Sequence, residues 1–419
     1  MSLSAQASQP TAFESTGNAA ASRSAHFLEL LRQAEAGDAR AQYSLAGAYV
    51  AGRDVPKNDA EAVRWYLVAA QNGLADAQNR IGYLYGHGLG VHQDYGEAVR
   101  WFRSAAERKL PEAQSNLAYM YQYGEGVQRD YARAADLYRQ AAAQGVAAAR
   151  NGLGVAYLHG YGVPRNATAA FDLVRLAAEQ GLAVAQHNLG MMYFEDEGVA
   201  RNYPEALKWF SNAANQGTIE TYRALGHMYE FGNGVNRDPE KAAELYRKAA
   251  EHGLVNAQLE LAHLYQAGKG FQHDYFEAAK WYRRAAEQGH PVGENAIGVM
   301  YYRGEGVRGD YKQAAEWFLR AANQNCVLAQ VNLGLLYLRG LGVPLDYAEA
   351  YKWFMLAAKE GDAESKRVLK ELTQIMTKTQ LRDGQSRVSD WISQNNNPIF
   401  VGQKAEPEEL NSDISARVP

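Results

Sequence analysis

The chain has 419 residues and a formal net charge of -4, with acidic and basic residues interspersed along its length. This balance argues against a basic surface for nucleic acid or for membranes. Cys326 is the single cysteine, which excludes an internal disulfide framework and favours a reducing, cytoplasmic setting. The length alone predicts two or three domains, but an internal repeat would override that expectation.

The two ends of the chain differ in composition from the rest. The first 25 residues have neither the basic start nor the apolar run of a secretory signal. No stretch approaches the roughly 18 consecutive apolar residues that span a bilayer, so no membrane-spanning helix is predicted. Residues 1–25 and 393–419 are polar, and we expect both segments to be disordered.

One short motif returns throughout the sequence. Residues 124–134 read GEGVQRDYARA, and related segments begin at residues 52, 88, 160, 196, 232, 268, 304 and 340. The spacing is 36 residues in every case, without insertion or deletion over nine copies. A strict period in this range is typical of a solenoid, in which one supersecondary unit is stacked repeatedly.

Each copy contains two helical patterns. In the second copy, ADAQNRIGYLYGH (75–87) places apolar residues at helical spacing on one face, and we call this the A helix. After a glycine loop, DYGEAVRWFRSAAERK (94–109) shows the same spacing, and we call this the B helix. The repeat is therefore predicted to be a helical hairpin, and the chain an all-α solenoid of nine such hairpins.

The loop glycines could cradle a phosphate or only bend the chain. The first loop glycine is replaced once, by Asp196, and the second once, by Asp54. An anion does not suit a phosphate cradle, whereas Asp tolerates the left-handed backbone conformation better than most residues. We therefore interpret the glycines as backbone geometry, and this interpretation expects Gly126→Asp to be milder than Gly126→Val.

Other positions are nearly constant among the copies. The position of Asp130 is always Asp or Asn, which favours a helix cap over a metal ligand or a catalytic acid. Three residues later, Glu or Gln stands in six of nine copies, which predicts a capping box. The position of Tyr121 is always Tyr, and the position of Gly82 is always Gly or Ala. An aromatic stripe can be a stacking platform, but repetition in every copy favours a packed core.

Together these positions spell AQ, LG and Y, then GxGV, DY, A, W with an aromatic, AA and G. The segment Ala185–Gly217 matches this pattern nearly throughout, and the sequence closely resembles the Sel1-like repeat family, which is related to the tetratricopeptide repeats. The resemblance covers roughly Ala39 to Ala363. It implies a right-handed α-solenoid whose A helices line a concave surface. It also implies an adaptor or scaffold for protein complexes, often in bacterial signalling, envelope or host-interaction contexts.

The resemblance also gives a domain organisation. Residues 39–361 are expected to form the nine repeats, 26–38 an N-terminal capping helix, and 362–392 C-terminal capping helices. Lys109 and Asn325 depart from the family pattern, because they replace the glycine that closes the B helix. We expect slight local bends there and no loss of the fold.

No enzyme signature accompanies the repeats. The sequence lacks an SxxK pair, HExxH, CxxC and an EF-hand loop, so we predict no catalysis, no cofactor and no metal. The expected function is a monomeric, cytoplasmic adaptor that binds one or more proteins, and neither nucleic acid nor membrane. Two alternatives stay open, a secreted or translocated bacterial effector and, by family analogy, a β-lactam-interacting hydrolase.

Partner residues are expected at variable positions of the A helices, which the family scheme places on the concave face. His227 and His263 hold the same position in neighbouring repeats, and Arg223 shares a helix face with His227. A metal site is one interpretation, but stacked hairpins about 10 Å apart hold such ligands too far from one ion. A groove for an acidic or aromatic peptide is favoured over it, and solvated polar residues without a partner are the simplest interpretation. The candidate residues are Tyr83, Tyr119, His187, Met191, Arg223, His227, Phe231, Leu259 and His263.

The peptide interpretation makes two further predictions. Binding of an acidic partner to these histidines should tighten as the pH falls toward about 6, because histidine gains a proton there. The double change Arg223→Glu with His227→Ala should weaken binding and leave thermal stability unchanged.

Overall fold

The computed structural model describes residues 25–268 and 272–395. The regular secondary structure in these ranges is entirely helical, which confirms the all-α prediction. A and B helices of 13 residues alternate at the spacing of the sequence repeat. The A helices are α2 (Ala39–Ala51), α4 (Ala75–His87), α6 (Pro111–Tyr123), α8 (Ala147–His159), α10 (Ala183–Glu195), α12 (Ile219–Phe231), α14 (Val255–Ala267), α16 (Pro291–Arg303) and α18 (Val327–Arg339). The B helices are α3 (Asp59–Gln71), α5 (Tyr95–Glu107), α7 (Tyr131–Ala143), α9 (Ala167–Glu179), α11 (Tyr203–Asn215), α13 (Pro239–Glu251), α15 (Tyr275–Glu287), α17 (Tyr311–Asn323) and α19 (Tyr347–Lys359).

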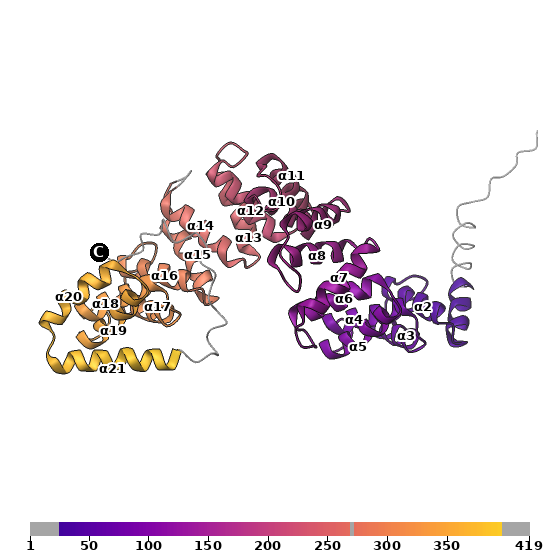
Figure 1. Cartoon of the computed structure of the whole chain (residues 1–419), viewed down its shortest axis with the longest axis horizontal. Coiled ribbons are helices and arrows are strands. Elements are labelled where there is room, and N and C mark those ends of the chain that lie inside the picture. The colour runs from indigo at the N-terminus through magenta and orange to yellow at the C-terminus, as the bar shows by residue number, and fades with distance from the viewer. Residues whose placement is uncertain (1–24, 269–271, 396–419) are drawn as a thin grey trace, which may run out of the picture. The chain divides into compact units, whose positions relative to one another are not determined.

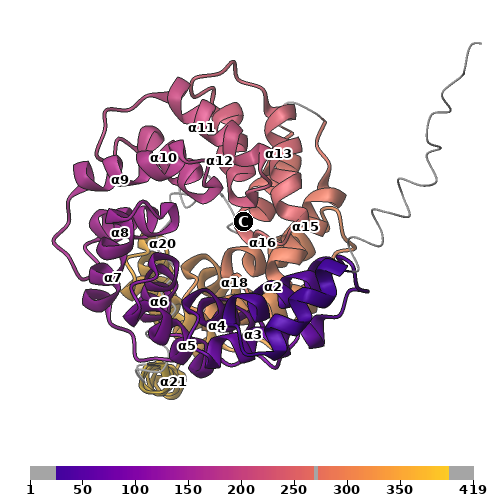
Figure 2. The same ribbon diagram turned by 90° about the vertical axis from the view of Figure 1, so that its right-hand side faces the viewer.

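The chain divides into two compact units, Met1–Ala213 and Ala214–Pro419, and the boundary lies inside α11. We call them unit 1 and unit 2. Within unit 1 the hairpins follow one another side by side (Figure 1). The A helices α6, α8 and α10 lie toward the inside of the curve of this unit, and α7 and α9 lie toward its outside (Figure 2). Within unit 2, α14 packs between α13 and α15.

Further helices stand at both ends of the repeats. A helix over residues 25–35 precedes α2, and α20 (Ala363–Ile375) and α21 (Lys378–Asn395) both pack against α19. Residues 393–395 therefore belong to a helix, contrary to the expected disorder from residue 393 onward. The rest of the two segments expected to be disordered, apart from residue 25, lies outside the described residues.

Every B helix of the nine repeats begins at the predicted cap. A side-chain oxygen of Asp or Asn accepts from a backbone N–H three residues later, as Asp130 does from Arg133 at 3.0 Å. The predicted capping box was wrong, because the cap's own N–H donates to the carbonyl of the repeated tyrosine. Asp130 N lies 2.9 Å from Tyr121 O. The glutamate of the supposed box pairs instead with a basic residue three positions on, as Glu97 does with Arg100.

The two loop glycines have different roles. The first ends the A helix in the left-handed conformation, with φ 73° at Gly124 and 67° at its replacement Asp196. The second, Gly126, has φ 65° and also touches the preceding repeat, because a Cβ there would stand 2.2 Å from the carbonyl oxygen of Tyr95. The backbone interpretation is therefore confirmed. Since any Cβ at position 126 collides with this backbone, both Gly126→Asp and Gly126→Val should be destabilising, and the milder effect of Asp stays a prediction.

The repeated aromatic and small residues form the core. A Cβ on Gly82 would lie 2.8 Å from the ring of Phe102, so the small residue at this position lets the A and B helices approach closely. In several repeats the hydroxyl of the repeated tyrosine also bonds to an arginine of the preceding B helix, as Arg283 Nη2 donates to Tyr301 at 2.7 Å. The constant aromatic position therefore serves packing between repeats.

A buried glutamine ties several A helices to the preceding B helix. Gln258 Nε2 donates to the carbonyl oxygen of Ala250 at 3.1 Å. In the second repeat, Gln78 makes the equivalent bond to the carbonyl oxygen of Ala70. In the eighth repeat the residue is Glu294, which is fully buried and has no proton to donate when ionised.

Glu294 has a different set of partners. It accepts from Arg320 Nε and from Gln324 Nε2, each at 2.8 Å. Arg320 Nη2 donates in turn to the carbonyl of Ala286 at 3.4 Å, the oxygen that glutamine would have bonded. Burial raises the pKa of Glu294, and the charge of Arg320 offsets only part of this effect.

Glu294→Gln is expected to stabilise unit 2 increasingly as the pH rises from about 4 to about 7. A carboxyl whose pKa is raised by folding contributes stability below its ordinary pKa of about 4.3, and this contribution is lost as the pH rises through the folded value. Glutamine has no such loss, and it can donate to Ala286 as Gln258 does to Ala250. Urea denaturation of both proteins at several pH values measures the difference, and a difference that does not change with pH would contradict it.

Lys109→Gly is expected to raise the free energy of unfolding by about 1 kcal/mol. Lys109 closes α5 with φ 64°, a conformation that costs a β-carbon-bearing residue about that much relative to glycine. Asn325 has the same φ of 64°, but asparagine tolerates it better, so Asn325→Gly should gain less. Urea denaturation of the two variants measures both gains in unfolding free energy. Equal gains would contradict the expected difference between lysine and asparagine.

Candidate interaction surface

Four aromatic side chains form two pairs of neighbouring rings on adjacent A helices of unit 1, one pair stacked and the other tilted. The ring centroids of Tyr83 and His87 on α4 are 4.0 Å apart, and those of Tyr119 and Tyr123 on α6 are 4.5 Å apart. The three tyrosines are 38%, 46% and 56% exposed in chain order. We call these four residues the aromatic face. Such rings supply large contact area at low entropic cost, which is why tyrosine is enriched at interfaces.

A surface hollow of about 250 Å³ lies beside the aromatic face, and Tyr83 forms part of its wall. Side chains of α2, α4 and α6 contribute to it. Small-molecule sites usually enclose about 300–1,000 Å³, so this hollow fits one side chain of a partner better than a substrate. The lining residues are Tyr43, Asp76, Asn79, Arg80, Tyr83, Leu110, Glu112 and Asn116.

Contacts within the wall hold the hollow in shape. The guanidinium carbon of Arg80 lies 5.5 Å from the ring centroid of Tyr83 and 5.7 Å from that of Tyr66. Asn116 Nδ2 donates to Asn79 Oδ1 at 2.9 Å and so joins α6 to α4. The asparagine bond therefore holds α6 against α4, the two helices that carry the aromatic face.

The candidate residues of unit 2 are engaged in packing and pairing. Arg223 Nη1 donates to Glu260 Oε1 at 2.8 Å and so joins α12 to α14. Leu259 is 3% exposed and belongs to the core, so the expectation that it lines a groove was wrong. The rings of His227 and Phe231 lie 4.5 Å apart, and Phe231 is exposed.

The remaining candidates are half-buried side chains. His263 lies on α14 of unit 2, whereas His187 and Met191 lie on α10 of unit 1. The ring centroid of His187 is 5.7 Å from that of Phe210. The residues that the sequence suggested as one cationic patch are therefore divided between the two units, and only the tyrosines of unit 1 share an exposed surface.

The ion pair between α12 and α14 stands where other repeats carry paired asparagines. Asn188 Nδ2 donates to Asn151 Oδ1 at 3.0 Å, and Asn332 donates to Asn295 in the same way at 2.9 Å. Each pair joins one A helix to the next, with the partners 37 positions apart. From the sequence, the position of Arg223 was interpreted as free to specify a ligand. In these repeats the side chain at this position instead bonds to the neighbouring A helix.

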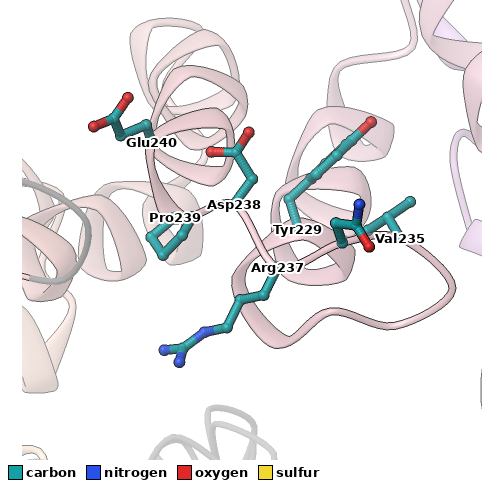
Figure 3. Close-up of a pocket in the computed structure, with 7 residues that line it drawn as sticks. Tyr229, Val235, Arg237, Asp238, Pro239 and Glu240 are labelled. Carbon is teal, nitrogen blue, oxygen red and sulfur yellow. The ribbon is translucent and has the colours of Figure 1, made fainter.

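A second hollow, of about 570 Å³, lies in unit 2 at the loop between α12 and α13 (Figure 3). Pro239 and Glu240 form one side of it. In unit 1 the corresponding backbone at Tyr95 is covered by Gly126 of the next repeat. The counterpart of that glycine, residue 270, lies outside the described residues, so we assign no ligand to this hollow.

The described part of the chain contains no group of three or more His, Cys, Asp or Glu side chains placed to hold a metal ion. Burial raises the pKa of the Cys326 thiol, which disfavours the nucleophilic thiolate. Within residues 25–268 and 272–395, no helix has both the length and the apolar character needed to cross a membrane.

Comparison with protein-family models gives nine consecutive matches to the Sel1 repeat, over residues 39–74, 75–110, 111–146, 147–182, 183–218, 219–254, 255–290, 291–326 and 327–362. Among solved structures, the chain is similar to a protective antigen of uropathogenic Escherichia coli with an SLR fold. The two are 33% identical over 87% of this chain and 86% of that one, with a TM-score of 0.48. A Sel1 repeat protein from Oxalobacter formigenes is 31% identical over 82% of this chain and 89% of that one, with a TM-score of 0.45. A comparison with curated proteins gave no match.

Proposed function

The chain belongs to the Sel1 repeat family, and on this premise we propose that it is a non-catalytic scaffold that binds a partner protein through the A helices of unit 1. Repeat solenoids of this kind are interaction folds, because their stacked units offer extended surfaces to other molecules. The family that matches is a repeat family, and this supports a scaffold.

The aromatic face carries the proposal. In a solenoid, residues repeated in every copy hold neighbours together, and residues that vary can specify ligands. The position of Tyr83 and Tyr119 varies among the copies, and it is Gly47 in the first and Val155 in the fourth. Tyrosines at such a position are not demanded by the packing of repeats. Their exposure of 38% and 46% leaves them able to contact a partner.

The double variant Tyr83→Ala with Tyr119→Ala is expected to abolish partner capture and to leave stability nearly unchanged. Exposed residues of this kind change the unfolding free energy by about 0.5 kcal/mol or less each, whereas aromatic anchors commonly carry 2 kcal/mol or more of binding. The measurement is affinity purification of the full chain from its source cells with quantitative mass spectrometry, together with a thermal melt.

Phe276→Ala supplies the matched control. Phe276 is 68% exposed on α15, a B helix of unit 2, so its removal deletes an exposed aromatic ring outside the aromatic face. Proteins retained by the wild type and by this control, but lost by the tyrosine double variant, support the proposal. Equal capture by all three proteins would mean that the partner binds elsewhere, and no reproducible capture by the wild type would refute the scaffold function.

A further inference from the structure

We infer that the aromatic face and its neighbouring hollow bind an extended basic peptide, with a lysine or arginine side chain held between Asp76 and Glu112. The inference rests on the proposed function, because it names the chemistry of the partner for the same surface. It reverses the charge expected from the sequence, where the histidines and Arg223 suggested an acidic partner.

Two carboxylates flank the hollow. Asp76 and Glu112 hold the same position in neighbouring repeats, in the first turns of α4 and α6, and both line the hollow. Both are exposed, and neither forms an ion pair with a described residue. Negative charge interacts favourably with the first turn of a helix, so both positions suit an acidic side chain.

A third carboxylate extends the negative charge along the aromatic face. Glu125 follows α6 and is half-buried. Burial is the main cause that raises the pKa of the Tyr119 phenol, and the negative charge of Glu125 raises it further. Glu125 likewise forms no ion pair with a described residue. A peptide that lies across α4 and α6 therefore meets carboxylates at both helices.

Tyrosine rings at the hollow already hold one cation, the guanidinium of Arg80. Arg80 is the basic residue among those lining the hollow, and its guanidinium lies over Tyr66 and Tyr83. It is occupied by these rings and does not neutralise Asp76 or Glu112. Tyrosine rings attract a cation through their negative faces, and the attraction grows when the cation is partly removed from water. The ring of Tyr43, which also lines the hollow, offers the same kind of contact to an incoming side chain.

A short extended peptide is long enough to contact several A helices at once. Neighbouring A helices lie about 10 Å apart, and an extended chain advances about 3.3 Å per residue. A peptide of about ten residues therefore crosses α2, α4 and α6, and its alternate side chains point toward the same face. The surface repels nucleic acid and acidic peptides, since both carry negative charge.

The test uses the purified full chain and three fluorescein-labelled peptides of about ten residues each. In one peptide lysine alternates with glycine, in the second glutamate alternates with glycine, and the third is neutral and rich in proline. The proline-rich peptide matters because aromatic grooves also bind polyproline helices. Fluorescence anisotropy near pH 8, where ordinary histidines carry no charge, gives each dissociation constant at low and at high salt.

The double variant Asp76→Asn with Glu112→Gln is expected to raise the dissociation constant of the lysine peptide about tenfold, because both charge-assisted contacts are lost. The control variant Glu35→Gln with Glu107→Gln removes the same net charge from exposed positions of unit 1 outside the face. It should bind within about twofold of the wild type, since only general attraction is lost. Salt should weaken binding of the lysine peptide to the wild type.

The inference is overturned if the glutamate or proline-rich peptide binds as tightly as the lysine peptide, or if none of the three binds. It is also overturned if the two double variants bind the lysine peptide equally. Any of these results is compatible with tyrosine-dependent capture of a partner from cells. The charge chemistry inferred here would then be wrong, while the proposed function would stand.

Discussion

Gly126→Ala is expected to lower the free energy of unfolding of unit 1 by an amount on the order of 4 kcal/mol. The methyl group would stand 2.2 Å from the carbonyl oxygen of Tyr95 and 2.7 Å from the amide nitrogen of Gly96, both of them backbone atoms of α5. Backbone cannot rotate away as a side chain can, so neighbouring hairpins must separate. Positive φ adds a penalty of about 1 kcal/mol. Urea denaturation followed by circular dichroism measures the loss.

Gly124→Ala is the matched control, because it changes the other glycine of the same loop. Gly124 has φ 73°, and its Cβ would meet only the side chain and backbone of Arg129, at 3.2 Å or more. We expect a loss of about 1 kcal/mol from backbone strain alone. Gly90→Ala should lie between the two, because its nearest contact is the side chain of Val63 at 3.0 Å. Equal losses at positions 124 and 126 would show that the hairpins move apart without cost.

The difference between the two glycines could not be predicted from the sequence. Each was replaced once by aspartate, and this suggested one shared tolerance of the left-handed conformation. Asp54 is indeed at φ 62°, but it stands in the first repeat. The residue that would correspond to Tyr95 there is residue 23, which lies outside the described residues. Periodicity predicts the conformation of a position, whereas its contact with the preceding repeat differs between copies. A Cβ on Gly90 would lie 3.7 Å from the carbonyl oxygen of Asp59, compared with 2.2 Å for the equivalent contact of Gly126.

The hairpins could be predicted from the sequence because every copy carries the same local signals for starting and ending its helices. The cap at Asp130 and the glycine that ends α6 are set by backbone geometry within one repeat. The capping box failed for a reason outside the local motif. The amide of Asp130 already has a partner in the carbonyl of Tyr121, which comes from the preceding helix. A sequence motif that fits a helix start does not reveal a stronger competitor elsewhere in the hairpin.

The candidate interaction surface was only partly predictable. Tyr83 and Tyr119 were expected from the sequence and lie exposed, whereas the histidine and arginine cluster was not assembled into one surface. The sequence did contain a signal against Arg223 as a ligand residue. Asparagines recur 37 residues apart, as in Asn295 and Asn332, and comparing each repeat position by itself hides this pairing between positions.

Arg223→Glu is expected to lower the free energy of unfolding of unit 2 by an amount on the order of 3 kcal/mol. Glu260 is only 8% exposed and accepts from Arg223 at 2.8 Å, so the change places a second carboxylate against a nearly buried one. The original expectation of unchanged thermal stability for a variant containing this substitution is therefore replaced by a large loss. Urea denaturation at neutral pH measures it. Lowering the pH toward 4 should recover part of the loss, because protonation of either carboxyl removes the repulsion.

The double variant Arg223→Asn with Glu260→Asn separates charge repulsion from damage to the helix contact. It recreates the pair seen at Asn295 and Asn332, where a 2.9 Å hydrogen bond joins two buried asparagines. Replacing both members of an ion pair is often nearly neutral, whereas removing one leaves the other buried and unsatisfied. The double variant should therefore lie within about 1 kcal/mol of the wild type. If it is as unstable as Arg223→Glu, the contact between α12 and α14 needs more from these residues than a matched polar pair, and the asparagine pairs of other repeats are not its equivalents.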